Sequence, residues 1–499
     1  MIVRYFVVFL AALVLYGVSC APGTVWQDSG LIQYRVWHND IEGFRGLAIS
    51  HPLYYIVAIG AKQVPFGEFG WRVNFVSAVA AAIAVANLYL LVRLWLGRDF
   101  PAVIAALTLA VSHTFWWHAS IAETYTLWAA LFLGELIMFL EYTRTKRVGY
   151  LYWLGLLNGL ALAVHMLAMI PLACYVVFLV VQLVNGSIRA RDLAIVAALW
   201  VLGALPYEYL ILKNIIHSGD LLGTLASAAF GDRWRADVLN TALSWKLIQE
   251  DVLFLLLNFP TPNALLFLAG LYGLHKTSLT SAFRNVVLAL LVLFFVFACR
   301  YTIADRYAFF LPFYCVGAVV IGLGVHELQS RLHHATVPCL IVVFAVMPVA
   351  AYAAAPGLAQ HLKLPIGTRQ DVPHRNDYEY FLQPWKTGYA GAERFAREAL
   401  ETAEPNAVIY ADSTTVPPLL YVQEVKGLRP DVKIVTGTVS SRRAPCVNEQ
   451  TIGGLIEEHP VYVVSKQRGY CPAFILGKYP LAEAGVLWRV VKPVPVDGR

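Results

Sequence analysis

The chain has 499 residues, of which 59% are hydrophobic and only 14% are charged. This composition excludes a set of soluble domains of that length and indicates an integral membrane protein. The net charge of +6 does not point to nucleic-acid binding, because Arg and Lys gather at the ends of apolar segments, where they orient membrane helices.

Eleven apolar segments approach the length of about 20 residues that a helix needs to cross a bilayer core. The apolar run 150–184 is too long for one helix, so we divide it at His165. The segment 51–64 is too short to span and is closed by Pro65 and Gly67, which predicts an interfacial helix. The expected spans are 2–20, 75–95, 101–117, 125–140, 150–165, 166–184, 193–210, 252–274, 286–299, 307–325 and 337–352.

Basic residues in the short loops fall on one side of these spans, which predicts that this side is cytoplasmic. They include Arg4, Arg93, Arg144 and Arg331. An odd number of spans then places the C-terminus outside the cytoplasm, together with most of the loop acids. Residues 1–20 also have the basic start and apolar stretch of a cleaved signal peptide, but a retained first span is the favoured interpretation.

Charged residues concentrate near the C-terminal end, which predicts a membrane domain over 1–355 and a soluble extracytoplasmic domain over 356–499. Helix-like segments at 391–402 and 418–426 alternate with strand-like segments at 406–411, 432–436 and 461–465. This alternation predicts a small α/β domain. Cys446 and Cys471 lie in this domain, where a disulfide is one option. The other five cysteines lack metal-ligand spacing and are interpreted as packing residues.

Two acidic residues of the outer loops are the candidate catalytic groups. Asp28 follows the first span directly, where the membrane wall reduces solvation and can tune a carboxylate for general-base work. Glu123 ends an aromatic-rich outer hairpin, 115–125, whose tryptophans are typical of an interfacial belt. For each residue, a solvated loop charge is the plainer alternative.

Three further polar residues lie at or inside the spans. Arg306 begins the tenth span beside Asp305 and is either a ligand for a lipid phosphate or half of a structural ion pair. Glu135 is in the middle of the fourth span, so it must be paired, protonated or facing a cavity. His165, at the expected turn, is suited either to a hydrogen bond within the bundle or to a phosphate.

Seven short motifs, in this order, resemble those of the polytopic GT-C-type glycosyltransferases. The closest resemblance is to the domain-of-unknown-function family related to the animal transmembrane O-mannosyltransferase. The motifs are Gln27-Asp28-Ser29-Gly30, His51-Pro52-Leu53-Tyr54, 72–78, 115–125 ending in Ala-Glu-Thr-Tyr, 159–165, 305–312 and 427–432. They cover most of the chain.

The resemblance implies inverting transfer of a sugar, with mannose one candidate, from a polyprenyl-phosphate donor to an acceptor hydroxyl. Asp28 takes the position of the base, and Arg306, with His51 or His165, is the candidate for binding the departing phosphate. Protein O-glycosylation is the activity favoured by analogy, and a glycan acceptor stays open. The expected fold is an all-α polytopic bundle of about eleven transmembrane helices, GT-C-like, with an extracytoplasmic α/β domain.

The chain departs from the family pattern at two positions. Leu31 stands where a second acid usually follows, and Leu53 replaces the second proline after His51. The missing acid predicts that another carboxylate completes the site. Glu123 is the favoured partner, and Asp40 and Glu42 are alternatives.

Two other functions compete with sugar transfer. A transporter or lipid flippase would suit the many spans and Glu135, although no internal repeat is evident. A scaffold that only displays its tail is the third candidate. The expected location is a bacterial inner membrane, or the endoplasmic reticulum in a eukaryote. The expected partners are a polyprenyl-phosphate-linked sugar, an acceptor protein or glycan and membrane lipid, with no nucleic acid. No cofactor is indicated with certainty, and a divalent metal stays open.

Overall fold

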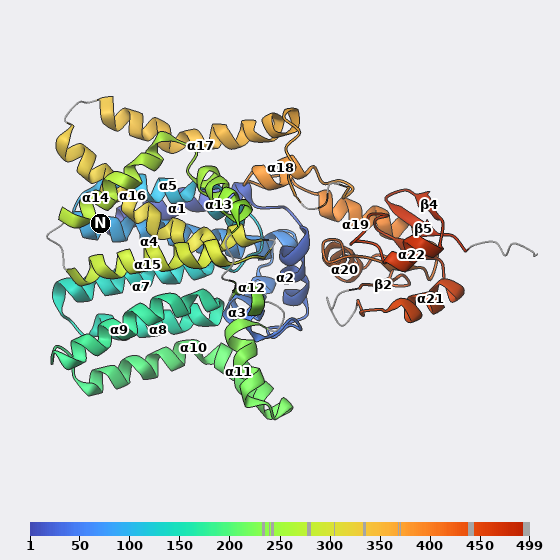
Figure 1. The fold of residues 1–499 in the computed structure, drawn as a ribbon, viewed down its shortest axis with the longest axis horizontal. Helices are drawn as coiled ribbons and strands as arrows, with labels where there is room; N and C mark the ends of the chain where they lie inside the picture. The colour runs from blue at the N-terminus through green and yellow to red at the C-terminus, as the bar shows by residue number, and fades with distance from the viewer. Residues whose placement is uncertain are drawn as a thin grey trace, which may run out of the picture.

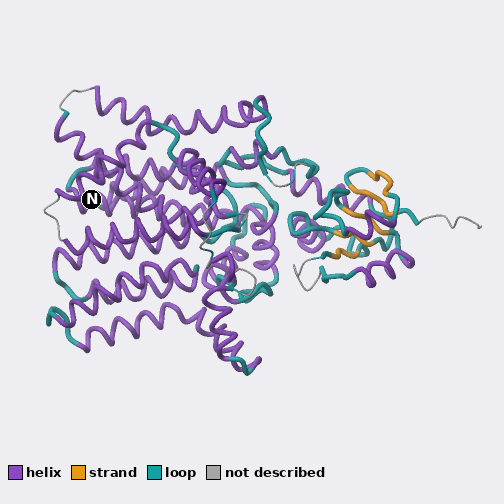
Figure 2. The backbone as a smooth tube through the Cα atoms, in the orientation of Figure 1, coloured by secondary structure: helices purple, strands orange, loops and turns teal. Residues whose placement is uncertain are grey.

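The computed structural model describes residues 1–231, 235–238, 240, 244–276, 281–303, 305–332, 336–367, 369, 371–437 and 444–492. It shows a bundle of long helices with a smaller α/β domain at one end (Figure 1). Figure 2 shows that the strands of the described residues gather in this smaller domain. The predicted fold class, a helical membrane bundle with a C-terminal α/β part, is therefore confirmed.

Each of the eleven expected spans corresponds to a helix or to a pair of helices. Within the described residues, eight helices are long and apolar enough to cross a membrane, or up to ten if two bent pairs each count as one span. The helices that correspond to the expected spans, singly or as pairs, are α1 (Ile2–Ser19), α4 (Phe69–Leu96), α5 (Asp99–Ala110), α6 (His113–Ala119), α7 (Tyr125–Thr145), α8 (Gly149–Val164), α9 (Met169–Val184), α10 (Ala190–Ser218), α13 (Trp245–Asn258), α14 (Leu265–Lys276), α15 (Ser281–Arg300), α16 (Leu311–Arg331) and α17 (Thr336–His361). Because α8 has only 16 residues, eleven crossings stay a prediction.

Two expected spans are broken rather than straight. The axes of α5 and α6 differ by 68°, and those of α13 and α14 differ by 110°. Pro260 and Pro262 lie between α13 and α14, and proline lacks the N–H that would continue the helical hydrogen bonds. The expected turn at His165 is present, because α8 ends at Val164 and a 3₁₀ turn begins at Met166.

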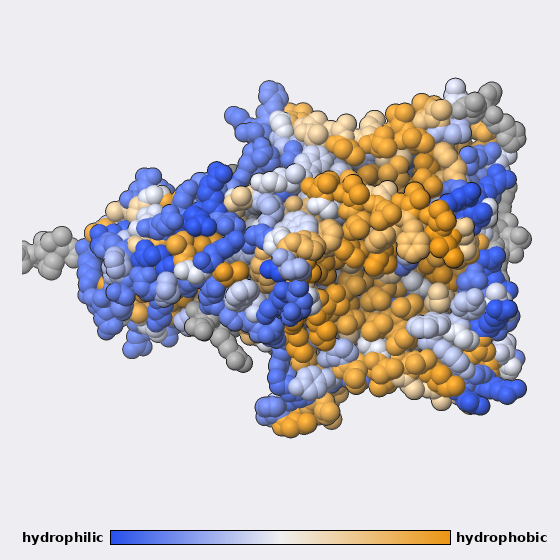
Figure 3. Space-filling view, turned by 180° about the vertical axis from the view of Figure 1, so that it is seen from behind, coloured by the Kyte–Doolittle hydropathy of each residue, from blue (hydrophilic) through white to orange (hydrophobic). Residues whose placement is uncertain are grey.

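The bundle has an apolar flank and a buried centre. Figure 3 shows a broad hydrophobic belt over the bundle and hydrophilic residues at its far edge and over the α/β domain. The helix α16 lies in the centre, where its whole apolar window is buried. The side chains of Arg4 and Arg93 both pair with Asp99, and Arg144 donates to Leu94, which gathers these basic residues at one end of the bundle. We call the opposite end, next to the α/β domain, the tail-side end.

Short helices cover the tail-side end. They are α2 (Gln27–Trp37), α3 (Pro52–Gly60), α11 (Leu221–Phe230) and α12 (Arg235–Val238), with 3₁₀ turns at Leu47–Ile49, Ala61–Gln63 and Arg306–Phe310. The helix α3 matches the short helix expected over 51–64. In contrast, α2 is not a predicted helix, because its polar and apolar residues form no long hydrophobic stretch.

The α/β domain is built on a five-stranded sheet of order β2-β1-β3-β5-β4. The first three strands are parallel and the last two pairings are antiparallel. The predicted segments 406–411, 432–436 and 461–465 contain β1 (Val408–Tyr410), β2 (Lys433–Val435) and β3 (Val461–Val463), whereas β4 (Leu481–Ala484) and β5 (Leu487–Val490) are additional. The helices are α18 (Asp377–Leu382), α19 (Gly391–Thr402), α20 (Val416–Leu420), a π turn (Tyr421–Val425), α21 (Glu449–Glu458) and α22 (Ala473–Lys478). The expected domain boundary after residue 355 lies inside α17 and stays a prediction.

Side chains of the α/β domain contact the tail-side end of the bundle directly. The Tyr421 hydroxyl donates to Glu68 and accepts a hydrogen bond of 2.8 Å from the Gly70 backbone N–H. The Lys426 ammonium lies 2.7 Å from the Glu68 carboxylate. These contacts join the start of α4 to the α/β domain and fix the short helices that lie between the two parts.

Candidate active site

Asp28 lies in the first turn of α2, where the positive end of the helix dipole favours a negative charge. Its side chain is 57% exposed, and its carboxylate lies 2.7 Å from the guanidinium of Arg45. The predicted base is therefore accessible to a substrate and is paired with a cation that the sequence interpretation did not single out.

The start of α2 is held by the α/β domain. The Gln27 backbone N–H donates to the Thr414 carbonyl at 3.4 Å, and a Cβ on Gly30 would lie 3.0 Å from the Cβ of Pro417. The same Cβ would lie only 2.4 Å from the Val25 carbonyl oxygen, so only glycine fits this position without a shift. The segment that carries Asp28 is thus clamped between the loop that follows α1 and the start of α20.

Glu123 lies beside Asp28 in space, although 95 residues separate them in sequence. The Ser29 hydroxyl, next to Asp28 in the chain, donates to the Glu123 carboxylate at 3.2 Å. The Glu123 backbone N–H donates to the Ser77 hydroxyl on α4 at 2.9 Å, which positions the loop before α7. Burial, followed by the negative charges of Asp28 and Asp305, raises the pKa of the Glu123 carboxyl well above its ordinary value. The structure thus brings the two predicted catalytic acids together.

Asp305 is a third carboxylate in this group, which we call the acidic cluster (Asp28, Glu123 and Asp305). The Asp305 side chain is open to solvent yet surrounded by many protein atoms. Desolvation and the charge of Asp28 raise the pKa of Asp305 to about 6, and the guanidinium of Arg45 opposes this shift. Sequence reasoning singled out the Asp305-Arg306 pair but assigned the chemistry to the arginine. The available signal was an acidic residue directly before an apolar span, as for Glu123.

His51 and His165 stack on each other beside the acidic cluster, with ring centroids 4.9 Å apart and an angle of 24° between the rings. His51 Nδ1 lies 2.7 Å from the Val164 carbonyl, so this nitrogen carries the proton and donates. His165 Nδ1 accepts from the Leu167 backbone N–H at 3.1 Å, so His165 Nε2 carries the proton. Hence His51 Nε2 is an acceptor and His165 Nε2 is a donor.

Both histidines are neutral at ordinary pH. Burial lowers the pKa of His51 to about 4, with the Val164 hydrogen bond opposing the shift. Burial, followed by the nearby His51, also lowers the pKa of His165 well below its ordinary value. The pair therefore offers neutral hydrogen-bonding groups to a ligand instead of two positive charges.

Arg306 is buried against α13. Its guanidinium is only 3% exposed and forms ion pairs with Glu250 at 3.1 Å and with Asp251 at 2.8 Å. The same group donates to the Leu247 carbonyl at 2.9 Å. These three partners lie on α13, so Arg306 ties the start of the α16 segment to α13.

The two alternative acids serve the loop after α2. Asp40 accepts from the backbone N–H groups of Glu42 and Gly43 and lies 3.6 Å from Arg35. The Glu42 carboxylate pairs with Lys213. Although burial opposes the change, hydrogen bonds from Lys213 and Asn214 lower the pKa of Glu42. Asp40 therefore braces a turn and Glu42 ties the loop to α10, whereas Glu123 is the acid that lies next to Asp28.

Three further predictions concern buried polar groups, metals and cysteines. Glu135 is fully buried in α7 and accepts a hydrogen bond of 3.2 Å from Asn158 on α8, so it is paired across helices as expected. Within the described residues, no group of three or more His, Cys, Asp or Glu side chains could hold a metal ion. All seven cysteines are free, so Cys446 and Cys471 are not bridged.

Comparison with known proteins supports this architecture. Residues 48–186 match the family model of the protein O-mannosyl-transferase TMEM260 N-terminal domain. The chain is also similar to the crystal structure of ArnT from Cupriavidus metallidurans in the apo state, with a TM-score of 0.62, 13% identity and 98% coverage of both chains. The same protein bound to undecaprenyl phosphate gives a TM-score of 0.61, 13% identity and 99% coverage of both chains.

At this low identity, the ArnT structures establish the fold, and the family match covers the stretch that carries His51, Glu123 and His165. Both findings agree with the resemblance that the sequence motifs indicated. The chain therefore has the GT-C fold seen in ArnT, and its residues 48–186 match the family model of the TMEM260 N-terminal domain.

Proposed function

We propose that this integral membrane protein transfers a sugar from a polyprenyl-phosphate donor to an acceptor hydroxyl, with Asp28 as the general base. The observation that carries the proposal is the acidic cluster at the tail-side end of the GT-C-type bundle, where the exposed Asp28 is paired with Arg45. The family match and the solved complex of ArnT with undecaprenyl phosphate support a lipid-linked donor.

In the proposed reaction, the acceptor oxygen attacks the anomeric carbon of the sugar while Asp28 takes its proton. A new bond forms between that carbon and the acceptor oxygen as the bond to the phosphate oxygen breaks. The polyprenyl phosphate leaves with the bonding electron pair, and the configuration at the anomeric carbon inverts. A positioned base contributes about 10²- to 10⁴-fold to such a proton transfer.

Arg45, instead of Arg306, is the cation that we assign to the donor phosphate. It lies beside Asp28, it opposes the pKa shift of Asp305, and its side chain is 30% exposed. When the phosphate of the donor arrives, the guanidinium exchanges its carboxylate partner for phosphate oxygens, to which its paired N–H groups are well matched. This exchange also frees Asp28 to accept a proton.

The two histidines complement the arginine in this proposal. His165 Nε2–H is suited to donate to a phosphate oxygen, and the lone pair of His51 Nε2 is suited to accept from a sugar or acceptor hydroxyl. Burial, followed by the charges of Asp28 and Asp305, raises the pKa of the Glu123 carboxyl, so we assign Glu123 to hydrogen bonding beside Asp28 instead of to the role of base.

We further propose that the acceptor is a protein hydroxyl and that the α/β domain, residues 356–499, lies outside the cytoplasm. The basic residues at the opposite end of the bundle support this orientation. The expected membrane is the bacterial inner membrane, or the endoplasmic reticulum in a eukaryote. The contact between Gln27 and Thr414 places the α/β domain next to the proposed base, where it can help to hold an acceptor.

The test is sugar transfer by the purified full-length protein in lipid nanodiscs. Polyprenyl-phosphate mannose and other polyprenyl-phosphate sugars are the donors, and Ser/Thr-containing polypeptides are the acceptors. Asp28→Asn is expected to lower the transfer rate at least about 100-fold. The control is Asp40→Asn, an acid of the same loop region that braces a turn. Equal transfer by wild type and Asp28→Asn would refute the assigned base, and lipid flux in liposomes without transferred sugar would favour a flippase.

A further inference from the structure

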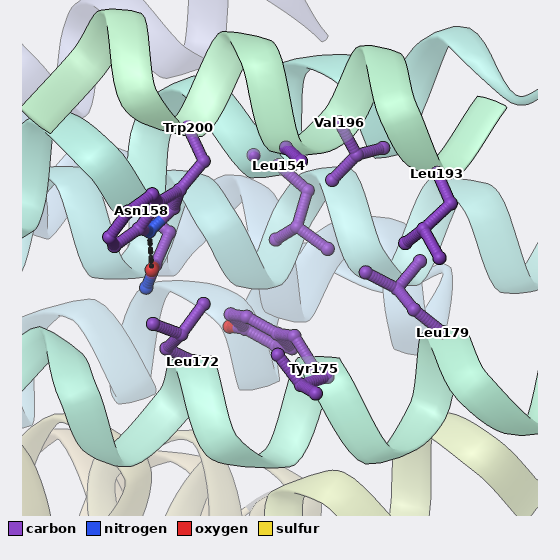
Figure 4. A pocket seen from close by; sticks show the side chains of 11 residues that line it. Leu154, Asn158, Leu172, Tyr175, Leu179, Leu193, Val196 and Trp200 are labelled. Atoms are coloured by element: carbon purple, nitrogen blue, oxygen red, sulfur yellow. Dashed lines mark hydrogen bonds between the residues drawn. The ribbon is translucent and has the colours of Figure 1, made fainter. Parts of the chain in front are cut away.

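A gap between α8, α9 and α10 is not used by the proposed chemistry. It has a volume of about 250 Å³ and opens at the flank of the bundle. Figure 4 shows Leu154 and Val196 facing Leu172 and Leu179 across it. Within the apolar belt of the bundle (Figure 3), a lining of this kind is suited to hydrocarbon.

The gap is held open because its walls belong to two separately packed units. A Cβ on Gly155 would lie 2.7 Å from the Val196 carbonyl oxygen, and one on Gly159 would lie 2.1 Å from the Trp200 carbonyl oxygen, so α8 and α10 are in backbone contact. In contrast, α9 packs toward α7, where the ring centroids of Phe178 and Phe139 are 4.8 Å apart. Such backbone contact through glycines makes a stiff wall.

The polar atoms near this gap are turned away from it. Trp200 Nε1 donates to Asn158 Oδ1 at 3.0 Å, the hydrogen bond drawn in Figure 4. The Asn158 amide in turn donates to the buried Glu135 carboxylate and to the Ala168 carbonyl, both at 3.2 Å. The surface that the lining leaves to the gap is apolar. The Tyr175 hydroxyl and Glu135 Oε1 are buried behind this surface without a hydrogen-bond partner, so a hydrocarbon occupant meets carbon atoms and not these polar groups.

The position of the gap connects it with the acidic cluster. The helices α8 and α9 that line it are joined at His165, which stacks on His51. Asn158 lies seven residues before His165, which corresponds to about 10 Å along the helix axis. A lipid whose phosphate lies at His165 therefore extends its chain down the flank of the bundle past Asn158 and into the gap.

We propose that this gap is the binding site for the prenyl chain of the lipid-linked donor. The proposal rests on the proposed function and deepens it, because it assigns the donor's lipid a site of its own. An engineered protein cavity of about 150 Å³ with a similar apolar lining holds benzene, so a gap of 250 Å³ has room for a branched segment of the chain. The occupant is a prenyl chain instead of a bulk phospholipid, because α8 and α9, which line the gap, meet at His165, the residue that the proposed function places at the donor phosphate.

Filling the gap from either wall tests the proposal. Val176 on α9 and Ala197 on α10 line the gap and are exposed at its rim, so Phe fits at both positions without disturbing the core. The matched controls are Val177→Phe and Ala198→Phe, at exposed neighbours that do not line the gap. Transfer is measured with a long-chain polyprenyl-phosphate sugar and with a short-chain, water-soluble prenyl-phosphate sugar.

Val176→Phe and Ala197→Phe are each expected to raise KM for the long-chain donor roughly tenfold, which corresponds to losing the burial of about two methylene groups. Their kcat with this donor, and both constants with the short-chain donor, stay as in the wild type and the controls. An unchanged KM for the long-chain donor, or an equal loss with both donors, overturns the proposal.

A binding measurement keeps this test independent of sugar transfer. Native mass spectrometry of the full chain is expected to show retention of undecaprenyl phosphate by the wild type and the controls, and weaker retention by the two filled variants. Equal retention by the filled variants overturns the assignment, and so does a selective loss of phosphatidylethanolamine, because the gap would then hold a bulk phospholipid. If retention follows the prediction but no donor sugar is transferred, the lipid site stands and the proposed reaction fails.

Discussion

Replacing Arg306 by Gln separates a structural role of this arginine from a role in binding phosphate. The guanidinium is 3% exposed, and its partner Asp251 is 11% exposed. Breaking a buried ion pair costs about 3 to 5 kcal/mol, because the remaining charge stays desolvated. The Glu250 partner is 35% exposed, so its pair adds less than about 1 kcal/mol. We therefore expect Arg306→Gln to lower the free energy of unfolding by about 3 to 5 kcal/mol.

The assay is denaturant unfolding of the full-length protein in detergent, combined with the transfer rate per folded molecule. Arg306→Gln is expected to lose stability and to keep transfer within a few-fold of the wild type. The contrasting variant is Arg45→Gln, whose partly exposed pair with Asp28 is worth at most about 1 kcal/mol of stability, and which is expected to lose transfer. In the double variant Arg306→Gln/Asp251→Asn, part of the lost stability should return. An Arg306→Gln protein that is as stable as wild type but inactive would refute the reasoning.

Three more predictions follow from the site and its supports. Gly30→Ala forces a methyl group against the Val25 carbonyl before α2, so the rate of sugar transfer should fall at least about tenfold. Gly60→Ala, where a methyl group meets open space, should leave this rate unchanged. Steady-state kinetics of transfer measures both effects. Desolvation by the surrounding protein atoms and the charge of Asp28 raise the pKa of Asp305 from 3.8 to about 6. The folded state therefore holds an extra proton between these values and loses stability as pH rises from 4 to 6. The melting temperature of Asp305→Asn should lack this fall, and identical pH profiles would contradict it. Tyr421→Phe removes the hydroxyl that joins the α/β domain to Glu68 and Gly70 at the start of α4 and should cost about 1 to 3 kcal/mol. The loss should appear as faster amide hydrogen exchange at this junction, and an unchanged exchange rate would contradict it.

Much of the bundle was predictable because hydrophobic length is a direct physical signal. Each expected span coincides with a helix or helix pair, since an apolar run can satisfy its backbone in lipid only by forming a helix. The bends were not predictable from length alone, although Pro260 and Pro262 mark one of them. In the α/β domain, the parallel strands follow continuous apolar runs, whereas β4 carries the exposed residues Ala482 and Glu483 and gives a weaker pattern.

The candidate site was predictable to the extent that its residues adjoin membrane helices. Asp28 and Glu123 each follow or precede a span, so the topology alone brings them to one end of the bundle. In contrast, the partner with which a charged side chain forms an ion pair depends on how the helices pack. The sequence could not decide whether Arg306 meets a phosphate or α13, nor could it indicate that Arg45 reaches back across 17 positions to Asp28.

The clamp on α2 has a consequence for building hybrid proteins. Thr414 and Pro417 of the α/β domain bear directly on Gln27 and Gly30, at the segment that carries Asp28. A graft that exchanges residues 356–499 for those of a relative would replace one side of this joint while leaving the other side native. Only grafts that take both α2 and the α/β domain from the same parent should therefore keep the Asp28 carboxylate in its native position.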